Sequence, residues 1–168
     1  MPGIGNDGLG KKAEDKIKQW LDKPENGYSF DRFYDQMTGY FMTSRNICDF
    51  VCYKYPNQYY IESKATYEDR FNFSMLTETQ HDGLLQKSTI PGVYGLVIIL
   101  FATYQKAFIL DIRDIKKLEE DGKKSLNIKK RDKWNTSYAE IPTIPSRKSL
   151  LDYDGDLQGL VENMEVGR

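Results

Sequence analysis

The strongest constraint on the fold of this chain is a pair of apolar, β-prone segments joined by a short turn. The first segment, GLVIILF, provides most of the longest apolar run, residues 96–102, and the second, KAFILDI, begins at Lys106. Each has the length of a strand buried in a core. Both are far shorter than the roughly 20 apolar residues that span a bilayer, so no membrane segment is expected. The pair predicts two core strands with a turn at residues 103–105.

The other segments complete a mixed α/β pattern. Ala13, Ile17 and Leu21 recur at helical spacing, and Thr77 followed by Gln80 resembles a capping box that opens a helix. The predicted elements are a helix over about 11–21, strands over 46–55 and 58–66, a helix over 77–88 and a short helix over 113–122. This order predicts a mixed β-sheet flanked by helices.

The length of 168 residues suits one domain with a single core. We expect the domain to cover residues 11–150, with residues 1–10 as a flexible leader and residues 151–168 as an acidic, mobile tail. The aromatic-rich residues 28–46 have no clear period and predict an irregular or short-stranded connection. The opening GIGNDG matches a dinucleotide-binding string but follows no strand, so we reject that function.

The net charge of −1 hides an uneven distribution. Residues 116–133 hold eight basic and four acidic side chains, which is compatible with nucleic-acid binding but does not require it. Cys48, Cys52 and His81 are too few for a structural zinc site. Reduced thiols and the absence of a signal-peptide pattern lead us to expect a cytoplasmic protein.

Charged residues in the second strand are the main functional feature. Side chains alternate between the faces of a strand, so Glu62 and Lys64 in YYIESKAT share one face. If Pro56 and Asn57 form a two-residue turn, Lys64 pairs with Asp49, and the three charged side chains converge. A register slip of one residue would separate them.

Two chemistries fit this group of charges. Buried carboxylates are costly unless they are paired or bind a metal, and Mg²⁺ prefers oxygen ligands. A lysine beside such an ion could orient a water or neutralise charge on a phosphate. A surface salt bridge on an edge strand is the alternative, and the spacing alone leaves both open.

The spacing of Asp49, Glu62 and Lys64 resembles the signature of the PD-(D/E)XK nuclease superfamily, with Cys48 where that superfamily usually has proline. Glu14, in the first helix, matches the superfamily's helix glutamate. The succession over about residues 8–115, with the segment FSML and then Gln80, resembles the RecU-type Holliday junction resolvases of low-GC Gram-positive bacteria and their phages. The archaeal Hjc-type resolvases are a close second.

The resemblance implies a restriction-endonuclease-like core and a site that cuts DNA with Mg²⁺, or with Mn²⁺ in its place. Asp49, Glu62, the Ser63 carbonyl and Glu14 would hold the metal. Lys64 would align the attacking water. Gln80 would orient Lys64 or that water, although a plain helix cap remains an alternative.

The resemblance also implies branched double-stranded DNA as substrate, a homodimer, no membrane, and a bacterial cytoplasm as location, possibly for a phage-encoded protein. The basic stalk that RecU proteins insert before the catalytic aspartate is not evident. The candidate DNA contacts are basic residues: Arg45, Lys11, Lys12, Lys87, Lys129, Lys130 and Arg131.

Two further functions stay open at this stage. One is another PD-(D/E)XK nuclease, either restriction-like or acting in branched-DNA repair. The other is a DNA-binding module that keeps the fold without the chemistry, which the complete set of Asp49, Glu62 and Lys64 disfavours. Cleavage of four-way, flap and linear DNA would separate these functions.

Overall fold

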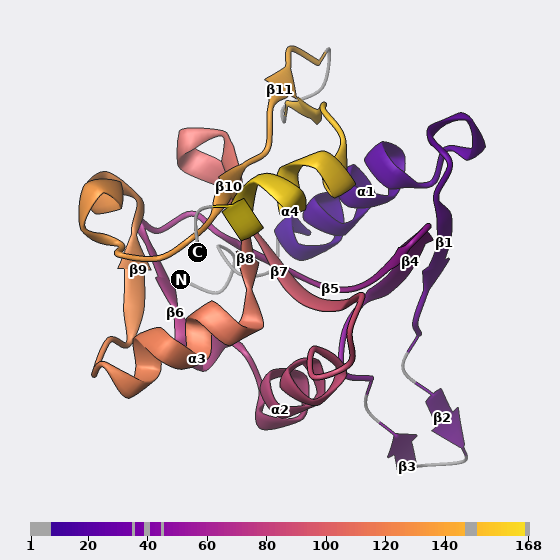
Figure 1. Ribbon diagram of the computed structural model, residues 1–168, viewed down its shortest axis with the longest axis horizontal. Helices are drawn as coiled ribbons and strands as arrows, with labels where there is room; N and C mark the ends of the chain where they lie inside the picture. Colours follow the sequence, from indigo (N-terminus) through magenta and orange to yellow (C-terminus); the bar gives the residue numbers. More distant parts are fainter. Residues whose placement is uncertain (1–7, 35, 39–40, 45, 147–150, 167–168) are drawn as a thin grey trace.

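A six-stranded mixed sheet forms the centre of the protein (Figure 1). The computed structural model describes residues 8–34, 36–38, 41–44, 46–146 and 151–166. In order across the sheet, the strands are β1 (Ser29–Arg32), β4 (Phe50–Lys54), β5 (Asn57–Thr66), β7 (Val93–Phe101), β8 (Lys106–Asp111) and β10 (Ala139–Glu140). Only β5 and β7 run parallel, whereas the other neighbours are antiparallel.

Two pairs of helices cover the two faces of this sheet. α1 (Leu9–Leu21) and α4 (Leu157–Val166) lie on one face, and α2 (Glu78–Lys87) and α3 (Ile112–Glu120) lie on the other (Figure 1). The core has a layer on each side, which explains why β7 is apolar on both faces. The predicted fold class, a mixed sheet flanked by helices, is confirmed.

Short elements complete the described chain. Two-stranded sheets pair β2 (Gln36–Thr38) with β3 (Phe41–Ser44), β6 (Arg70–Asn72) with β9 (Ser125–Asn127), and β11 (Thr143–Ile144) with β12 (Asp152–Tyr153). Single 3₁₀ segments are η1 (Pro24–Asn26), η2 (Phe73–Met75), η3 (Ala102–Tyr104) and η4 (Ile128–Lys133). The expected short-stranded connection before β4 therefore contains β1 and the β2–β3 hairpin. None of the helices among the described residues has the length and apolarity to cross a membrane.

The expected helix starts are also found. α1 begins at Leu9, two residues earlier than expected, and buries Ala13, Ile17 and Leu21 against the sheet. At α2, the Thr77 hydroxyl accepts from the Gln80 backbone N–H while the Gln80 side chain accepts from the Thr77 N–H. This reciprocal pair is the capping box that the sequence predicted.

The register of the β4–β5 hairpin differs from the prediction by two residues. Lys54 pairs with Asn57, so the two-residue turn is Tyr55-Pro56 and not Pro56 with Asn57. Pro56, which lacks an N–H, occupies a turn position in both registers, so the proline does not choose between them. Phe50 pairs with Ile61, which leaves Asp49 opposite Glu62 and not Lys64. A shift of two residues keeps every side chain on its predicted face.

The C-terminal segment is not the mobile tail that its charge suggested. Leu157, Val161 and Met164 of α4 are buried in the core layer that α1 also lines. These residues follow helical spacing, and the exposed Glu162 shows that the acids face outward. Of the expected leader, residues 1–7 lie outside the described residues, and Leu9 already belongs to α1.

Gly95 on β7 provides a test of the close packing between the sheet and α2. A Cβ at this position would lie 2.7 Å from the backbone oxygen of Leu84. We expect Gly95→Ala to lower the free energy of unfolding in urea by about 1–3 kcal/mol. Gly10→Ala, at an open position in α1, is the control and should stabilise by about 0.5–1 kcal/mol. A Gly95→Ala protein as stable as the wild type would contradict this packing.

Candidate active site

Three of the predicted residues meet on the sheet face that α2 covers. The Lys64 ammonium lies 3.2 Å from the Glu62 carboxylate, and Asp49 accepts a hydrogen bond of 2.9 Å from the Ser63 backbone N–H. The Glu62 side chain is only 4% exposed and that of Lys64 is 18% exposed. β5 lies between β4 and β7, so the pair is not a surface salt bridge on an edge strand.

Gln80 joins α2 to this group. Its side-chain NH₂ donates to Oε2 of Glu62 at 3.1 Å, while its side-chain oxygen caps the helix at Thr77. The sequence left a helix cap and a site role as alternatives; the cap is present together with a contact to Glu62, and the site role stays a prediction. The contact is with Glu62 and not with Lys64.

Glu14 reaches the group from α1. The negative charge of Asp49 acts on it, and its Oε1 lies 3.3 Å from the Arg32 guanidinium. Arg32, on β1, was missed by the sequence reasoning because it falls in the segment without a period. The guanidinium also lies over the rings of Tyr34 and Phe50. A cation between aromatic residues was the one available signal.

The negative charge of Asp49 contributes to a raised pKa at both neighbouring glutamates. Burial first, and then the negative charge of Asp49, raise the pKa of Glu62 to about 8, although Lys64 opposes the shift. Burial and the Asp49 charge likewise raise the pKa of Glu14 to about 7, against the opposing effect of Arg32. These shifts arise because Asp49, Glu62 and Glu14 lie together in a partly buried region, here called the carboxylate corner.

The donor set fits a divalent metal ion. Oε1 of Glu62 is buried and has no hydrogen-bond partner among the described residues, whereas Oε2 is held by Gln80 and Lys64. No three His, Cys, Asp or Glu side chains of the described residues form a ready metal cage. The charge of Asp49 nevertheless acts on both Glu14 and Glu62, so the three carboxylates lie near one another. A cation would supply the partner that the buried oxygen lacks and would offset the repulsion.

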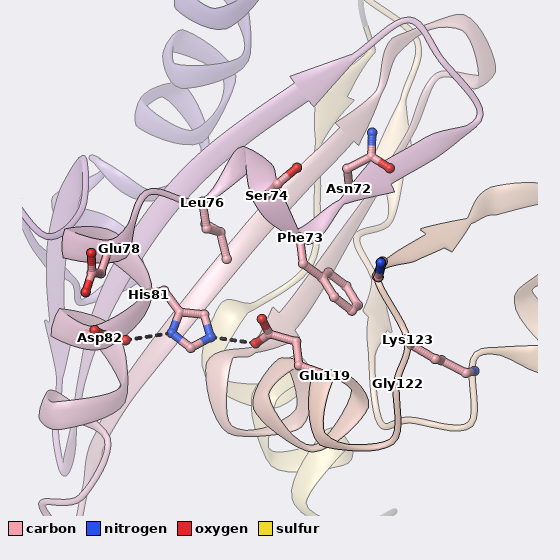
Figure 2. Close-up of a pocket in the computed structure, with 11 residues that line it drawn as sticks. Asn72, Phe73, Ser74, Leu76, Glu78, His81, Asp82, Glu119, Gly122 and Lys123 are labelled. Carbon is pink, nitrogen blue, oxygen red and sulfur yellow. Dashed lines mark hydrogen bonds and ion pairs between the residues drawn. The ribbon is translucent and has the colours of Figure 1, made fainter.

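A neighbouring pocket of about 630 Å³ lies between α2, η2 and α3 (Figure 2). Inside it, the His81 ring bridges the carboxylates of Asp82, at 2.9 Å, and Glu119, at 2.5 Å. Burial alone would lower the pKa of His81, but these two carboxylates raise it. Glu78 also lines the pocket, so its acidic lining does not favour a phosphate there.

The predicted DNA contacts are scattered over the surface. Lys11 and Lys12 are exposed at the start of α1, and Lys87 lies over the Tyr60 ring. Arg45 lies outside the described residues.

The predicted contacts near η4 differ in their partners. Lys129 lies 3.8 Å from Asp69, and Arg131 lies 2.6 Å from Glu140. Lys130 is exposed and lines a groove that Arg70, Lys124 and Lys133 share. Of these cations, only Arg70 lies outside the cluster 123–133 that the sequence predicted to contact DNA.

Comparison with known protein families gives one match, to RecU, described as recombination protein U, over residues 26–154. The matched range contains Asp49, Glu62, Lys64 and Gln80 but not Glu14. No curated protein matches the chain. Among solved structures, the chain is similar to Archaeoglobus fulgidus Hjc, described as a Holliday junction resolvase from an archaeal hyperthermophile. The identity is 12% and the TM-score 0.43, over 95% of this chain and 100% of that chain.

The raised pKa of Glu62 predicts a pH-dependent stability of the metal-free protein. The folded state binds the Glu62 proton more tightly than the unfolded state, so stability is greatest below about pH 4.5 for this group and falls as pH rises toward 8. The free energy of unfolding of Glu62→Gln, relative to that of the wild type, should therefore increase from pH 5 to pH 8 by on the order of 2–4 kcal/mol.

Urea unfolding in EDTA at pH 5 and at pH 8 measures this effect. The exposed Glu120→Gln is the control and should show no such trend. A constant difference between Glu62→Gln and the wild type at the two pH values would contradict the buried, repelled carboxylate.

Proposed function

Because this chain belongs to the recombination protein U family, we propose that it is a structure-specific DNA endonuclease that resolves four-way (Holliday) junctions by hydrolysing phosphodiester bonds. The observation that carries the proposal is the family match over residues 26–154, which includes the group of Asp49, Glu62 and Lys64. We propose the bacterial cytoplasm as the place where it would meet its DNA substrate.

The metal site of this enzyme would be built on the carboxylate corner. Asp49, Glu62 and the Ser63 carbonyl would hold Mg²⁺, or Mn²⁺ in its place, and Glu14 would hold a second ion or a metal-bound water. When bound, such an ion stabilises charge on the phosphate and makes a water more acidic. The partnerless Oε1 of Glu62 supports this assignment.

The remaining side chains position the reacting groups. Gln80 and Lys64 fix Oε2 of Glu62, and the Ser63 N–H fixes Asp49, so the carboxylates keep their geometry without a ligand. With 18% of its side chain exposed, Lys64 can also reach a water or a phosphate oxygen. We assign it the role of aligning the attacking water and neutralising charge that develops on the phosphate.

Glu14 and Arg32 limit the charge of the corner. The Arg32 guanidinium pairs with Glu14 and lowers the pKa that burial would otherwise raise further. This pairing keeps Glu14 ionisable near neutral pH, which a role as a metal ligand requires. Arg32 is therefore a positioning residue for Glu14 in this proposal.

Replacing either central carboxylate should separate binding from cleavage. We expect Asp49→Asn and Glu62→Gln to lower Mg²⁺-dependent junction cleavage by a factor of at least about 10², because the metal loses a ligand. Binding of a fixed junction, measured by gel shift in Ca²⁺, should change by less than about threefold, since basic residues elsewhere hold the DNA. Glu120→Gln serves as the matched control, and near wild-type cutting by Glu62→Gln would refute the metal assignment.

The enzyme should act as a homodimer. A junction has two symmetric strands to cut, and one site cannot reach both, so two copies related by a two-fold axis are required. We expect a dimer by light scattering and paired, symmetry-related cuts on a fixed four-way junction, with linear duplex left largely intact. A monomer at micromolar concentration, or equal cutting of linear duplex, would favour another PD-(D/E)XK nuclease instead.

A further inference from the structure

A groove of about 290 Å³ lies where β6, β9 and η4 meet, at the opposite end of the molecule from β1 (Figure 1). We call it the β6–β9 groove. Its lining includes five cationic residues and no acidic one. The cations are Arg70, Lys123, Lys124, Lys130 and Lys133. Such a surface favours a polyanion over an apolar ligand.

The cations of this groove differ from their neighbours in lacking acidic partners. Lys129 and Arg131 lie in the same stretch of sequence, but they pair with Asp69 and Glu140 and do not line the groove. Among the described residues, no ion pair involves Arg70, Lys124, Lys130 or Lys133. Tertiary contacts therefore neutralise some cations of residues 116–133 and leave the described groove cations without an acidic partner.

The base of the groove is fixed by packing and hydrogen bonds. Leu126 and Trp134 are 2% exposed, and the Trp134 indole N–H donates to the backbone oxygen of Asn127 at 2.8 Å. The Lys123 ammonium donates to the backbone oxygens of Lys133 and Trp134, so this lysine holds the turn together. Binding here would not require the backbone to be reordered.

The groove lies a short distance along the chain from the site. Arg70 is six residues beyond Lys64, so their Cα atoms are at most roughly 20 Å apart. Consecutive nucleotides of one DNA strand rise about 3.4 Å, so this distance corresponds to about six nucleotides. A strand cut beside Lys64 can therefore reach the groove.

We infer that the β6–β9 groove binds the sugar–phosphate backbone of a junction arm within about six nucleotides of the cut. This inference rests on the proposed function. The adjoining pocket shares Lys123 and Lys124 but is also lined by Glu78, Asp82 and Glu119. The β6–β9 groove has no carboxylate in its lining, so of the two hollows it is the more favourable one for a phosphate backbone.

The test uses two double variants with the same change in charge. Lys124→Gln/Lys130→Gln alters the groove, and Lys116→Gln/Lys117→Gln alters two exposed lysines on α3 that do not line it. Dissociation constants for a fixed junction, measured in Ca²⁺ at several salt concentrations, give the number of phosphate contacts. The groove variant should reduce the salt slope by about two and weaken binding about tenfold or more, whereas the α3 variant should change neither.

Two further measurements separate the groove from the fold and from the catalytic site. Lys124→Arg/Lys130→Arg should restore the slope, and the α3 variant should cleave the junction at close to the wild-type rate. In hydroxyl-radical footprinting, the groove variant Lys124→Gln/Lys130→Gln should no longer protect the DNA within about six nucleotides of the cut. An unchanged slope and footprint would contradict DNA binding at the groove without contradicting the proposed nuclease activity. A wild-type protein that neither binds nor cuts junctions would contradict the proposed function itself.

Discussion

The burial of Glu62 beside Asp49 is the interaction on which the site depends. A carboxylate that is 4% exposed next to a second carboxylate is unfavourable, and the raised pKa of Glu62 expresses that cost. The corner persists because β5 is held on both sides, by β4 and by the apolar β7. The two apolar layers around β7 and β8 supply the stability that tolerates it.

The residues around the carboxylate corner fix the positions of its side chains without neutralising their charge completely. Gln80 and Lys64 occupy one oxygen of Glu62 and leave the other without a partner, while Arg32 balances Glu14 from the far side. Complete neutralisation would leave nothing for a metal to bind. Incomplete neutralisation would leave the proposed metal site its affinity for a divalent cation, because the cation would relieve the repulsion among the carboxylates.

Face alternation was the part of the site that the sequence could predict. Asp49, Glu62 and Lys64 fall together in either of two registers that differ by two residues, so the incorrect turn assignment did not matter. Arg32 could not be predicted, because its partner Glu14 is distant in sequence and its own strand has no clear period. In the C-terminal helix two patterns disagree. Its acidic composition predicts a mobile tail, whereas the helical spacing of Leu157, Val161 and Met164 predicts the buried face that is found. Which lysines of the basic segment are neutralised depends on tertiary contacts with Asp69 and Glu140, which no local pattern reveals.

The separation of the acidic corner from the cationic groove resolves an electrostatic conflict. A phosphate that approaches Asp49, Glu62 and Glu14 without a metal meets like charges, and a net charge of −1 supplies no general attraction. In the proposed binding mode, the binding energy comes from cations at a distance, such as those of the β6–β9 groove, which would hold the strand beyond the cut. On this account DNA affinity and metal occupancy are coupled only through the scissile phosphate. Neutralising a site carboxylate then removes repulsion as well as a ligand, so loss of cleavage need not be accompanied by loss of binding.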